Sequence, residues 1–270
     1  MGYKKTKGTE MMKQTVMAQI VVRVGVATWL LVASSAVAAT TLESATTPTQ
    51  SSAGDAASGA LAPIELDLPE PMFVGTPRDI RSDNLEKPTG KARAPFMAPE
   101  GIVNLADGRP VDSSDPMPII GELELITDGD KEAGEGFFVE LGPMTQWVRI
   151  DLERPCEVFA VVVWHYHMQA RVYRDVVVTL SDNPEAILDA TDPDNILFNN
   201  DHDNSSGLGV GDDREYVETY EGRLIDAHGA RGRYLHLYSR GSTGSDENHY
   251  IEVEVYGRPL EEKTATDEHG

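Results

Sequence analysis

The most β-prone segment of this 270-residue chain lies in the stretch Trp147–His167, where two strand-like runs follow each other. In the first run, Trp147–Leu152, polar and apolar residues alternate, as they do on a strand with one buried face. The second run, Glu157–His167, is rich in valine and too apolar to have one face in water. We therefore expect a central strand of a sandwich that stops abruptly at His165–His167 and presents these polar residues at its end.

Further β-prone runs follow, and Gly, Asp, Asn and Pro separate them without any helical period. These runs are Tyr173–Ser181, Tyr216–Tyr220, Arg233–Ser239 and Tyr250–Tyr256. The last two alternate cleanly between apolar and polar side chains. Many short strands with turn-rich connections predict an all-β fold, an antiparallel β-sandwich of the jelly-roll type.

Composition divides the chain into four parts. Residues 1–39 combine basic residues with an apolar run of about 16 residues that ends in small side chains, which predicts a signal peptide and export to the periplasm, the cell surface or the medium. The alternative is a retained anchor, although a spanning helix needs roughly 20 apolar residues. Residues 40–100 predict a flexible linker and a Pro-rich extended arm, 101–258 the sandwich, and 259–270 a charged tail.

Acidic residues outnumber basic ones by 45 to 23, which gives a formal net charge of −22. Basic blocks are absent outside the leader, so nucleic acid is an unsuitable partner. Cys156 is the only cysteine, which excludes an intrachain disulfide and predicts a small buried residue. The sequence carries no G-x-S-x-G, H-E-x-x-H or phosphate-loop motif, so we expect a protein without catalytic activity.

Several short segments, taken in order, resemble the discoidin domain, the coagulation-factor C-type or galactose-binding-like module, in a bacterial exported subset. The segments are Asn104–Val111, Leu125–Asp130, Gln146–Leu152, Gly232–Tyr238 and Glu252–Gly257. The resemblance covers 101–258 and implies an eight-stranded jelly roll whose end loops bind glycans or other ligands. It also implies a structural calcium ion at one end. A single cysteine cannot form the disulfide usual in eukaryotic members.

Two acidic clusters are candidate cation sites. Asp128 and Asp130 flank a glycine, and strand alternation places Glu252 opposite its apolar neighbours. The resemblance implies that calcium binds there to Leu125, Asp128, Asp130, Ala133, Ile251 and Glu252. The alternative is a simple hairpin turn with Glu252 facing water. A second cluster predicts either a solvated loop or a second calcium site, and it comprises Asp201, Asp203, Asp212 and Asp213.

Polar and ring-bearing residues at the strand ends predict a rim that binds carbohydrate or a surface glycan. They are His165, Tyr166, His167, Arg171, Tyr173, Asn199, Asn200, Asp201 and His202. One alternative is an adhesion module that binds other exported proteins through the same loops. A further alternative is a zinc-dependent hydrolase, because His165 and His167 share one side of a strand and His202 could join them with Asp203. No membrane span is expected once the leader is removed.

Overall fold

The computed structural model describes residues 60–73, 80–185 and 195–261. These residues belong to one compact unit, Asp55–Gly270. The predicted signal peptide and most of the charged tail lie outside the described residues. In the described part of the chain, no helix is long and apolar enough to cross a membrane.

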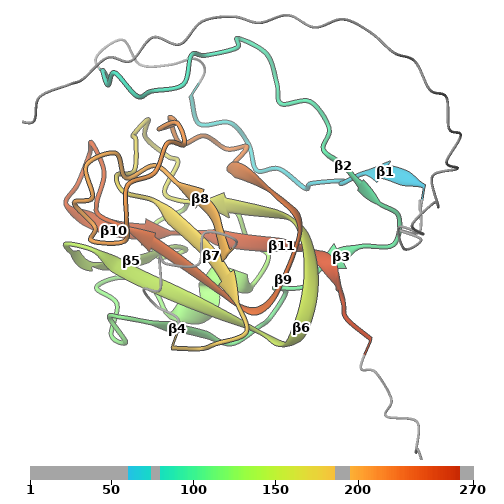
Figure 1. Cartoon of the computed structure of the whole chain (residues 1–270). Coiled ribbons are helices and arrows are strands. Elements are labelled where there is room, and N and C mark those ends of the chain that lie inside the picture. Colours follow the sequence, from blue (N-terminus) through green and yellow to red (C-terminus); the bar gives the residue numbers. More distant parts are fainter. Residues whose placement is uncertain (1–59, 74–79, 186–194, 262–270) are drawn as a thin grey trace, which may run out of the picture. The chain divides into compact units, whose positions relative to one another are not determined.

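The structure is built from antiparallel strands, as the alternation predicts, with one short 3-10 helix (Figure 1). The elements are β1 (Leu61–Pro63), β2 (Met97–Pro99), β3 (Val103–Asn104), β4 (Val111–Ser113), η1 (Leu123–Thr127), β5 (Val139–Pro143), β6 (Gln146–Trp164), β7 (Val177–Ser181), β8 (Ile196–Asn199), β9 (Arg223–Ser239), β10 (Glu247–Tyr250) and β11 (Glu252–Pro259).

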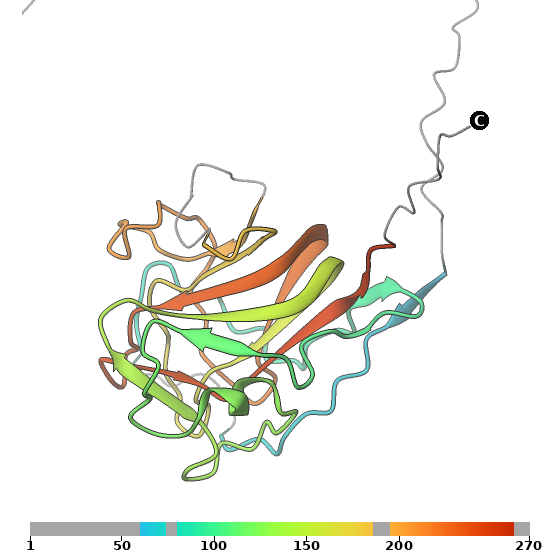
Figure 2. The same cartoon turned by 90° about the horizontal axis from the view of Figure 1, so that it is seen from below.

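Two long strands, β6 and β9, pair along both of their halves and bend together (Figures 1 and 2). The register shifts between Asp151 and Cys156, so each strand passes from one layer into the other at this corner. The first half of β6 also pairs with β4, and its second half pairs with β11. Strand β7 extends the layer beyond β9, and β8 follows β7. The predicted all-β antiparallel sandwich is confirmed.

Apolar side chains from both halves of β6 fill the space between the layers. Residues Val148 and Ile150 from the first half, and Val161 and Val163 from the second, are fully buried. They pack with Val253 and other apolar residues of β9 and β11 in one cluster. Fully burying a side chain of this size stabilises the fold by roughly 1.5–3 kcal/mol. The expected burial of Cys156, which is 1% exposed, is also confirmed.

The strand boundaries differ from the predicted ones in several places. The two predicted runs around Glu153 form one strand, because a residue in left-handed conformation (Glu153, φ 66°) makes a bend there without ending the strand. The strand predicted at Tyr216–Tyr220 is wrong, since this segment contains no strand and the nearest isolated bridge lies just before it, at Glu215. The predicted strand Tyr250–Tyr256 is divided between β10 and β11, and β1 to β5, β8 and the first half of β9 were missed.

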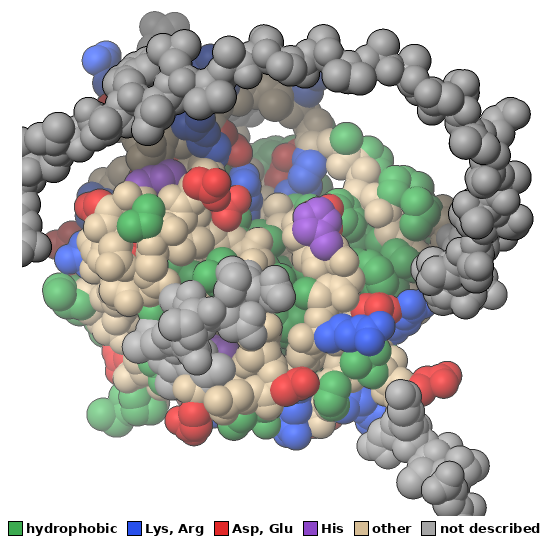
Figure 3. Space-filling view, viewed as in Figure 1, with side chains coloured by type: hydrophobic (Ala, Val, Ile, Leu, Met, Phe, Trp, Pro, Cys, Tyr) green, Lys and Arg blue, Asp and Glu red, His purple; other side chains and the backbone are tan. Residues whose placement is uncertain are grey.

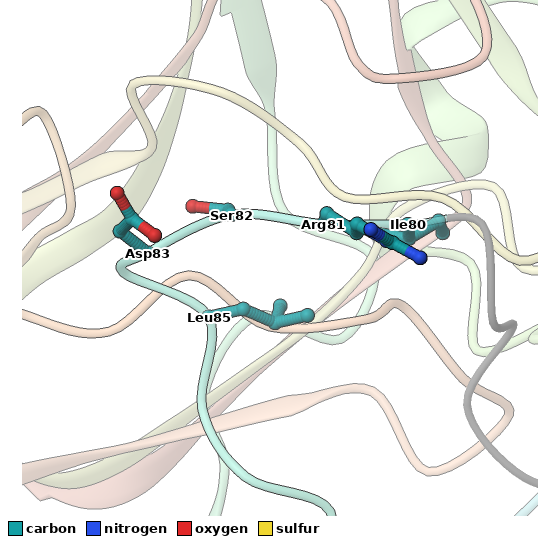
Figure 4. A pocket seen from close by; sticks show the side chains of 5 residues that line it. All are labelled: Ile80, Arg81, Ser82, Asp83 and Leu85. Atoms are coloured by element: carbon teal, nitrogen blue, oxygen red, sulfur yellow. The ribbon is translucent and has the colours of Figure 1, made fainter.

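The Pro-rich arm lies against the sandwich. Strands β1 and β2 pair with each other, and Leu66 packs on the outer cluster around Trp164. The guanidinium of Arg93 donates hydrogen bonds of 2.8 Å to the carbonyls of both Glu221 and Gly222. An open hollow of about 430 Å³ occurs on the arm, lined by Ile80, Arg81, Ser82, Asp83 and Leu85 (Figure 4). Its described lining residues all come from the arm, and one of them, Leu85, forms an isolated bridge with Glu215 of the segment before β9.

Two glycines with the same backbone conformation give a test of the packing around Trp164. Gly222 (φ 63°) lies so close to the indole that an added Cβ would be 2.7 Å from it, whereas Gly108 (φ 62°) has nothing within 4 Å. We expect Gly108→Ala to cost about 1 kcal/mol through its backbone alone. Gly222→Ala should cost about 1–3 kcal/mol more, because the buried ring cannot move aside. Urea unfolding measures both, and equal losses would contradict the described packing.

Candidate functional site

Three connections meet at one end of the sandwich: 165–176 after β6, 200–222 before β9, and 240–246 after β9. Backbone hydrogen bonds join them, so their positions relative to one another are fixed by the main chain. These bonds are Thr243 N to Val172 O (2.9 Å), Arg240 N to Arg174 O (2.9 Å), Arg174 N to Gly241 O (3.0 Å) and Glu218 N to Arg171 O (2.9 Å). We call this region the loop end.

A buried pair of polar side chains lies beneath the loop end. His165 Nδ1 is 3.1 Å from Glu218 Oε2, and neither side chain is more than 1% exposed. The His165 ring stacks on Tyr173 at a centroid distance of 4.3 Å. The second polar atom of each partner, His165 Nε2 and Glu218 Oε1, has no hydrogen-bond partner among the described residues. Such unsatisfied buried atoms are costly, so they are positions where a ligand or water would stabilise the fold.

Arg171 and Tyr166 connect this buried layer to the surface. The Arg171 guanidinium lies 4.7 Å from the centroid of the partly exposed Tyr166 ring. Arg171 is 7% exposed, and its Nε has no partner among the described residues. The loop backbone at Gly244 covers the guanidinium, since a Cβ there would be 3.4 Å from Arg171 Cζ. A small shift of this loop would expose a cationic, planar group beside an aromatic ring.

His249 and Glu140 complete the polar layer. Their Nε2 and Oε2 atoms are 3.1 Å apart, and His249 is buried while Glu140 is partly exposed. Burial lowers the pKa of His249 to about 4, and the nearby charges of Arg171 and His165 act in the same direction. Burial also raises the pKa of Glu140, and Glu247 adds to that effect. At neutral pH the imidazole of His249 is therefore uncharged.

The structure places the predicted rim residues deeper than the sequence suggested. The buried ones are His165, His167, Arg171, Tyr173, Asn199, Asn200 and Asp201, whereas Tyr166 and His202 are partly exposed. The expectation of an exposed rim is thus wrong for most of them, because strand β6 ends inside the fold and the loops close over its end. Ligand contact by these side chains stays a prediction. Sequence reasoning missed Glu218, Glu140 and His249, although Glu218 stood in a segment assigned to a strand.

The histidines do not gather as a zinc site. His167 Nε2 is 3.0 Å from the carbonyl of Lys131, whereas His165 pairs with Glu218. Among the described residues, only Asp175, Asp201 and Asp203 bring three metal-ligating side chains together. The hydrolase alternative therefore lacks its expected ligand set.

The three aspartates could hold a metal ion, since carboxylate oxygens from all three lie within 4.8 Å of one another. Burial raises the pKa of Asp175, and Asp201 and Asp203 add to that effect. Burial acts on Asp201 in the same direction, but hydrogen bonds from Ser206, Ser205 and Asp203 outweigh it and lower the pKa. The predicted members Asp212 and Asp213 are not in this group.

Glu252 of the predicted calcium site is fully buried, so the alternative that it faces water is wrong. Its Oε2 accepts a hydrogen bond from Gly129 N (3.1 Å), and its Oε1 has no partner among the described residues. Asp128 and Asp130 are exposed, and each accepts a backbone N–H from its own turn. These three carboxylates are not among the groups of ligating side chains that lie within 4.8 Å of one another in the described part of the chain, and joint calcium binding by them stays a prediction.

The remaining predicted ligands are backbone positions. Leu125 is partly buried, and Ala133 and Ile251 are buried. Burial raises the pKa of Glu252 to about 9, and the neighbouring Glu254 and Asp128 carboxylates add to this. A calcium ion fits here in one respect, because it would supply the missing partner of Glu252 Oε1.

Comparison with known proteins gives similarity only at the level of solved structures. No family model and no curated protein matches the chain. A family 89 glycoside hydrolase from Clostridium perfringens is 17% identical, with a TM-score of 0.40, over 61% of this chain and 16% of its own. A Streptococcus pneumoniae fucose binding module is 16% identical, with a TM-score of 0.37, over 58% of this chain and 96% of its own.

A second module, CpGH89CBM32-4 from Clostridium perfringens, was solved with GlcNAc-alpha-1,4-galactose. It is 16% identical with a TM-score of 0.40, over 59% of this chain and 96% of its own. The chain thus spans 16% of the hydrolase it matches. Carbohydrate-binding modules of the CBM32 type, which is the discoidin or galactose-binding-like family, are among the matches. At these identities and TM-scores, no residue role follows from the likeness.

Glu252 makes stability depend on pH in a defined direction. Its carboxyl has an ordinary pKa of 4.5, and burial raises the folded pKa to about 9. The folded state binds this proton more tightly, so the group's contribution to stability is complete below pH 4.5 and is lost as the pH rises toward 9. Without divalent cations, the free energy of unfolding of Glu252→Gln, taken relative to that of the wild type, should therefore rise by more than about 1 kcal/mol from about pH 5 to about pH 8.

Urea unfolding in EDTA at the two pH values measures this difference. Glu124→Gln, a change at an exposed carboxylate, is the control and should leave the pH dependence unaltered. A difference between Glu252→Gln and wild type that is constant with pH would contradict the buried state of Glu252.

Proposed function

We propose that this protein is a non-catalytic binding module that holds a carbohydrate at the loop end. The observation that carries the proposal is the convergence of three main-chain-linked loops over a buried layer of polar atoms that have no partner among the described residues, with the partly exposed Tyr166 ring beside the buried Arg171 guanidinium. Sugars are recognised by an aromatic face that contacts their C–H groups and by donors and acceptors that bind their hydroxyls. Tyr166 supplies the ring, Arg171 the donors and Glu140 the acceptor.

The buried pair supports binding in preference to catalysis. A general acid or base must come within hydrogen-bond reach of the reacting group. His165 and Glu218 are at most 1% exposed, which keeps them away from a bound polysaccharide. Their place beneath Arg171 and Tyr173 suits a supporting role, in which they hold the contacting side chains in position.

A protein partner is the second candidate, and exposed apolar side chains favour it. Met117, Ile119, Phe137 and Met144 are between 57% and 83% exposed, and they lie on the connections around β5. On the face seen in Figure 3, acidic and basic side chains are interspersed. Aromatic and methionine side chains of this kind are typical of protein interfaces. Export of the protein follows only from the leader sequence and remains part of this proposal.

A structural cation is a further part of the proposal. Glu252 is the favoured ligand, because its buried Oε1 lacks a partner in the part of the chain that the structure describes. The Asp175, Asp201 and Asp203 group is the other place where a divalent ion could bind. An ion at either position would stabilise the loops that it joins.

Sugar binding is tested with two matched tyrosines. Tyr166 and Tyr234 are both partly exposed, and each lies beside an arginine, at 4.7 Å from Arg171 and 4.9 Å from Arg233. Only Tyr166 belongs to the loop end. A glycan array followed by calorimetry should show that Tyr166→Ala weakens binding at least about tenfold, or about 1.4 kcal/mol. Tyr234→Ala should leave the affinity unchanged.

Two outcomes would count against the carbohydrate proposal. Equal losses in both variants would remove the loop end as the site. Absence of binding across a broad array, together with capture of an exported protein that Met144→Ser abolishes, would favour the protein-interaction alternative.

Calcium is tested by thermal unfolding. Millimolar calcium should raise the melting temperature by several degrees, since a ligand that binds only the folded state stabilises it by mass action. Glu252→Gln should abolish the rise, whereas Asp201→Asn should preserve it. Loss of the rise in Asp201→Asn alone would move the ion to the aspartate group. No rise in the wild type would remove the structural cation from the proposal.

A further inference from the structure

Lys131 places an ammonium group inside the loop that approaches Glu252. The residue is 9% exposed, and its Nζ lies 2.8 Å from Glu254 Oε1. The same atom is 3.3 Å from the carbonyl of Gly129 and 5.5 Å from the centroid of the Trp164 ring. A lysine is rarely buried unless its charge is paired. Here the pairing fastens the loop to the outer face of β11.

The charges on this face balance only while Glu252 is protonated, which its raised pKa of about 9 favours at neutral pH in the absence of a cation. Glu252 and Glu254 are two residues apart on β11, so both project to the same side of the sheet. Both are buried, at 0% and 6% exposure. When both are ionised, their two negative charges face the single positive charge of Lys131, so one negative charge remains uncompensated.

The uncompensated negative charge is that of Glu252. Glu254 is satisfied twice, by Lys131 through Oε1 and by the hydroxyl of Tyr256, which donates to Oε2 at 2.9 Å. Glu252 receives only the backbone N–H of Gly129, and its Oε1 has no partner among the described residues. The ammonium of Lys131 therefore compensates the charge of Glu254 and leaves that of Glu252 uncompensated.

We propose that Lys131 is a resident cation that sets a low affinity for divalent ions at Glu252. This inference rests on the structural cation in the proposed function and adds the residue that tunes it. The ammonium neutralises Glu254, which would otherwise attract the ion, and it also repels the ion directly. Both effects act over a few ångströms in a buried site, where water screens charges weakly. The ion that fits is a hard divalent cation such as calcium, since the nearby groups offer oxygen atoms.

The test removes the ammonium and then removes its partner. Calcium binding is measured by calorimetry in an Asp201→Asn background, which silences the aspartate group. Lys131→Met leaves both carboxylates available, so it should bind calcium at least about tenfold more tightly than the parent. Without calcium, it should also melt at a lower temperature. Lys131→Met combined with Glu254→Gln again leaves one uncompensated negative charge, as in the parent. The calcium affinity of this double variant should therefore return to within about threefold of that of the parent.

The outcomes distinguish a failure of the role of Lys131 from a failure of the proposed cation site. If the parent binds calcium and Lys131→Met binds no more tightly, the role of Lys131 is overturned and the cation site stands. If neither binds calcium, the cation site fails and the inference fails with it. Tighter binding in Lys131→Met, reversed in the double variant, supports both.

A variant that does not fold without calcium still gives an answer. If Lys131→Met is unfolded in EDTA, titration with calcium should refold it, as followed by near-ultraviolet circular dichroism. Failure to refold at any calcium concentration, while the double variant folds, would overturn the proposal. Lys131→Arg is the charge-conserving control and should keep the low affinity of the parent.

Discussion

The shared bend of β6 and β9 is the constraint on which the rest of the structure depends. Both strands cross from one layer to the other at the register shift near Cys156, so they pair along both halves and link the two sheets covalently. The end of β6, the start of β9 and the start of β11 consequently lie next to one another, since Trp164 pairs with Glu252 and Val163 pairs with Arg223. The loop end follows from this arrangement, because the connections at these strand ends must lie over the same end of the core.

Burial of polar side chains is the second consequence of this geometry. The residue directly after β6, His165, lies inside the fold and is fully buried. Glu218 from the segment before β9 pairs with it, and its ring stacks on Tyr173. This arrangement satisfies one polar atom of His165 and one of Glu218, and the other atom of each has no partner among the described residues. A polar layer of this kind is rigid and chemically incomplete, and both properties suit the floor of a binding site.

The sequence was sufficient for the fold class because apolar side chains at every second position identify strands and the face that meets the core. The structure buries Val148, Ile150 and Val253 as the alternation predicts, although it also buries the polar face of β11 at Glu252 and Glu254. The depth of the site could not be derived in this way. Whether His165 and Arg171 lie on a rim or beneath it depends on how far the loops after β6 and β9 fold over them, and those loops have no period. Likewise, the pairing of Lys131 with Glu254 joins residues 123 positions apart in the sequence.

We thus propose that the ligand binds at the loop end and that Lys131 sets the cation affinity on the outer face of β11. Ligand binding at the loop end is tested most directly by titrating the ¹⁵N-labelled protein with the tightest glycan of an array and mapping the amide shifts by NMR. We predict that the largest shifts fall in 165–176 and 240–246. Shifts concentrated on the outer face of β6 and β9, around Arg149 and Tyr234, would contradict it.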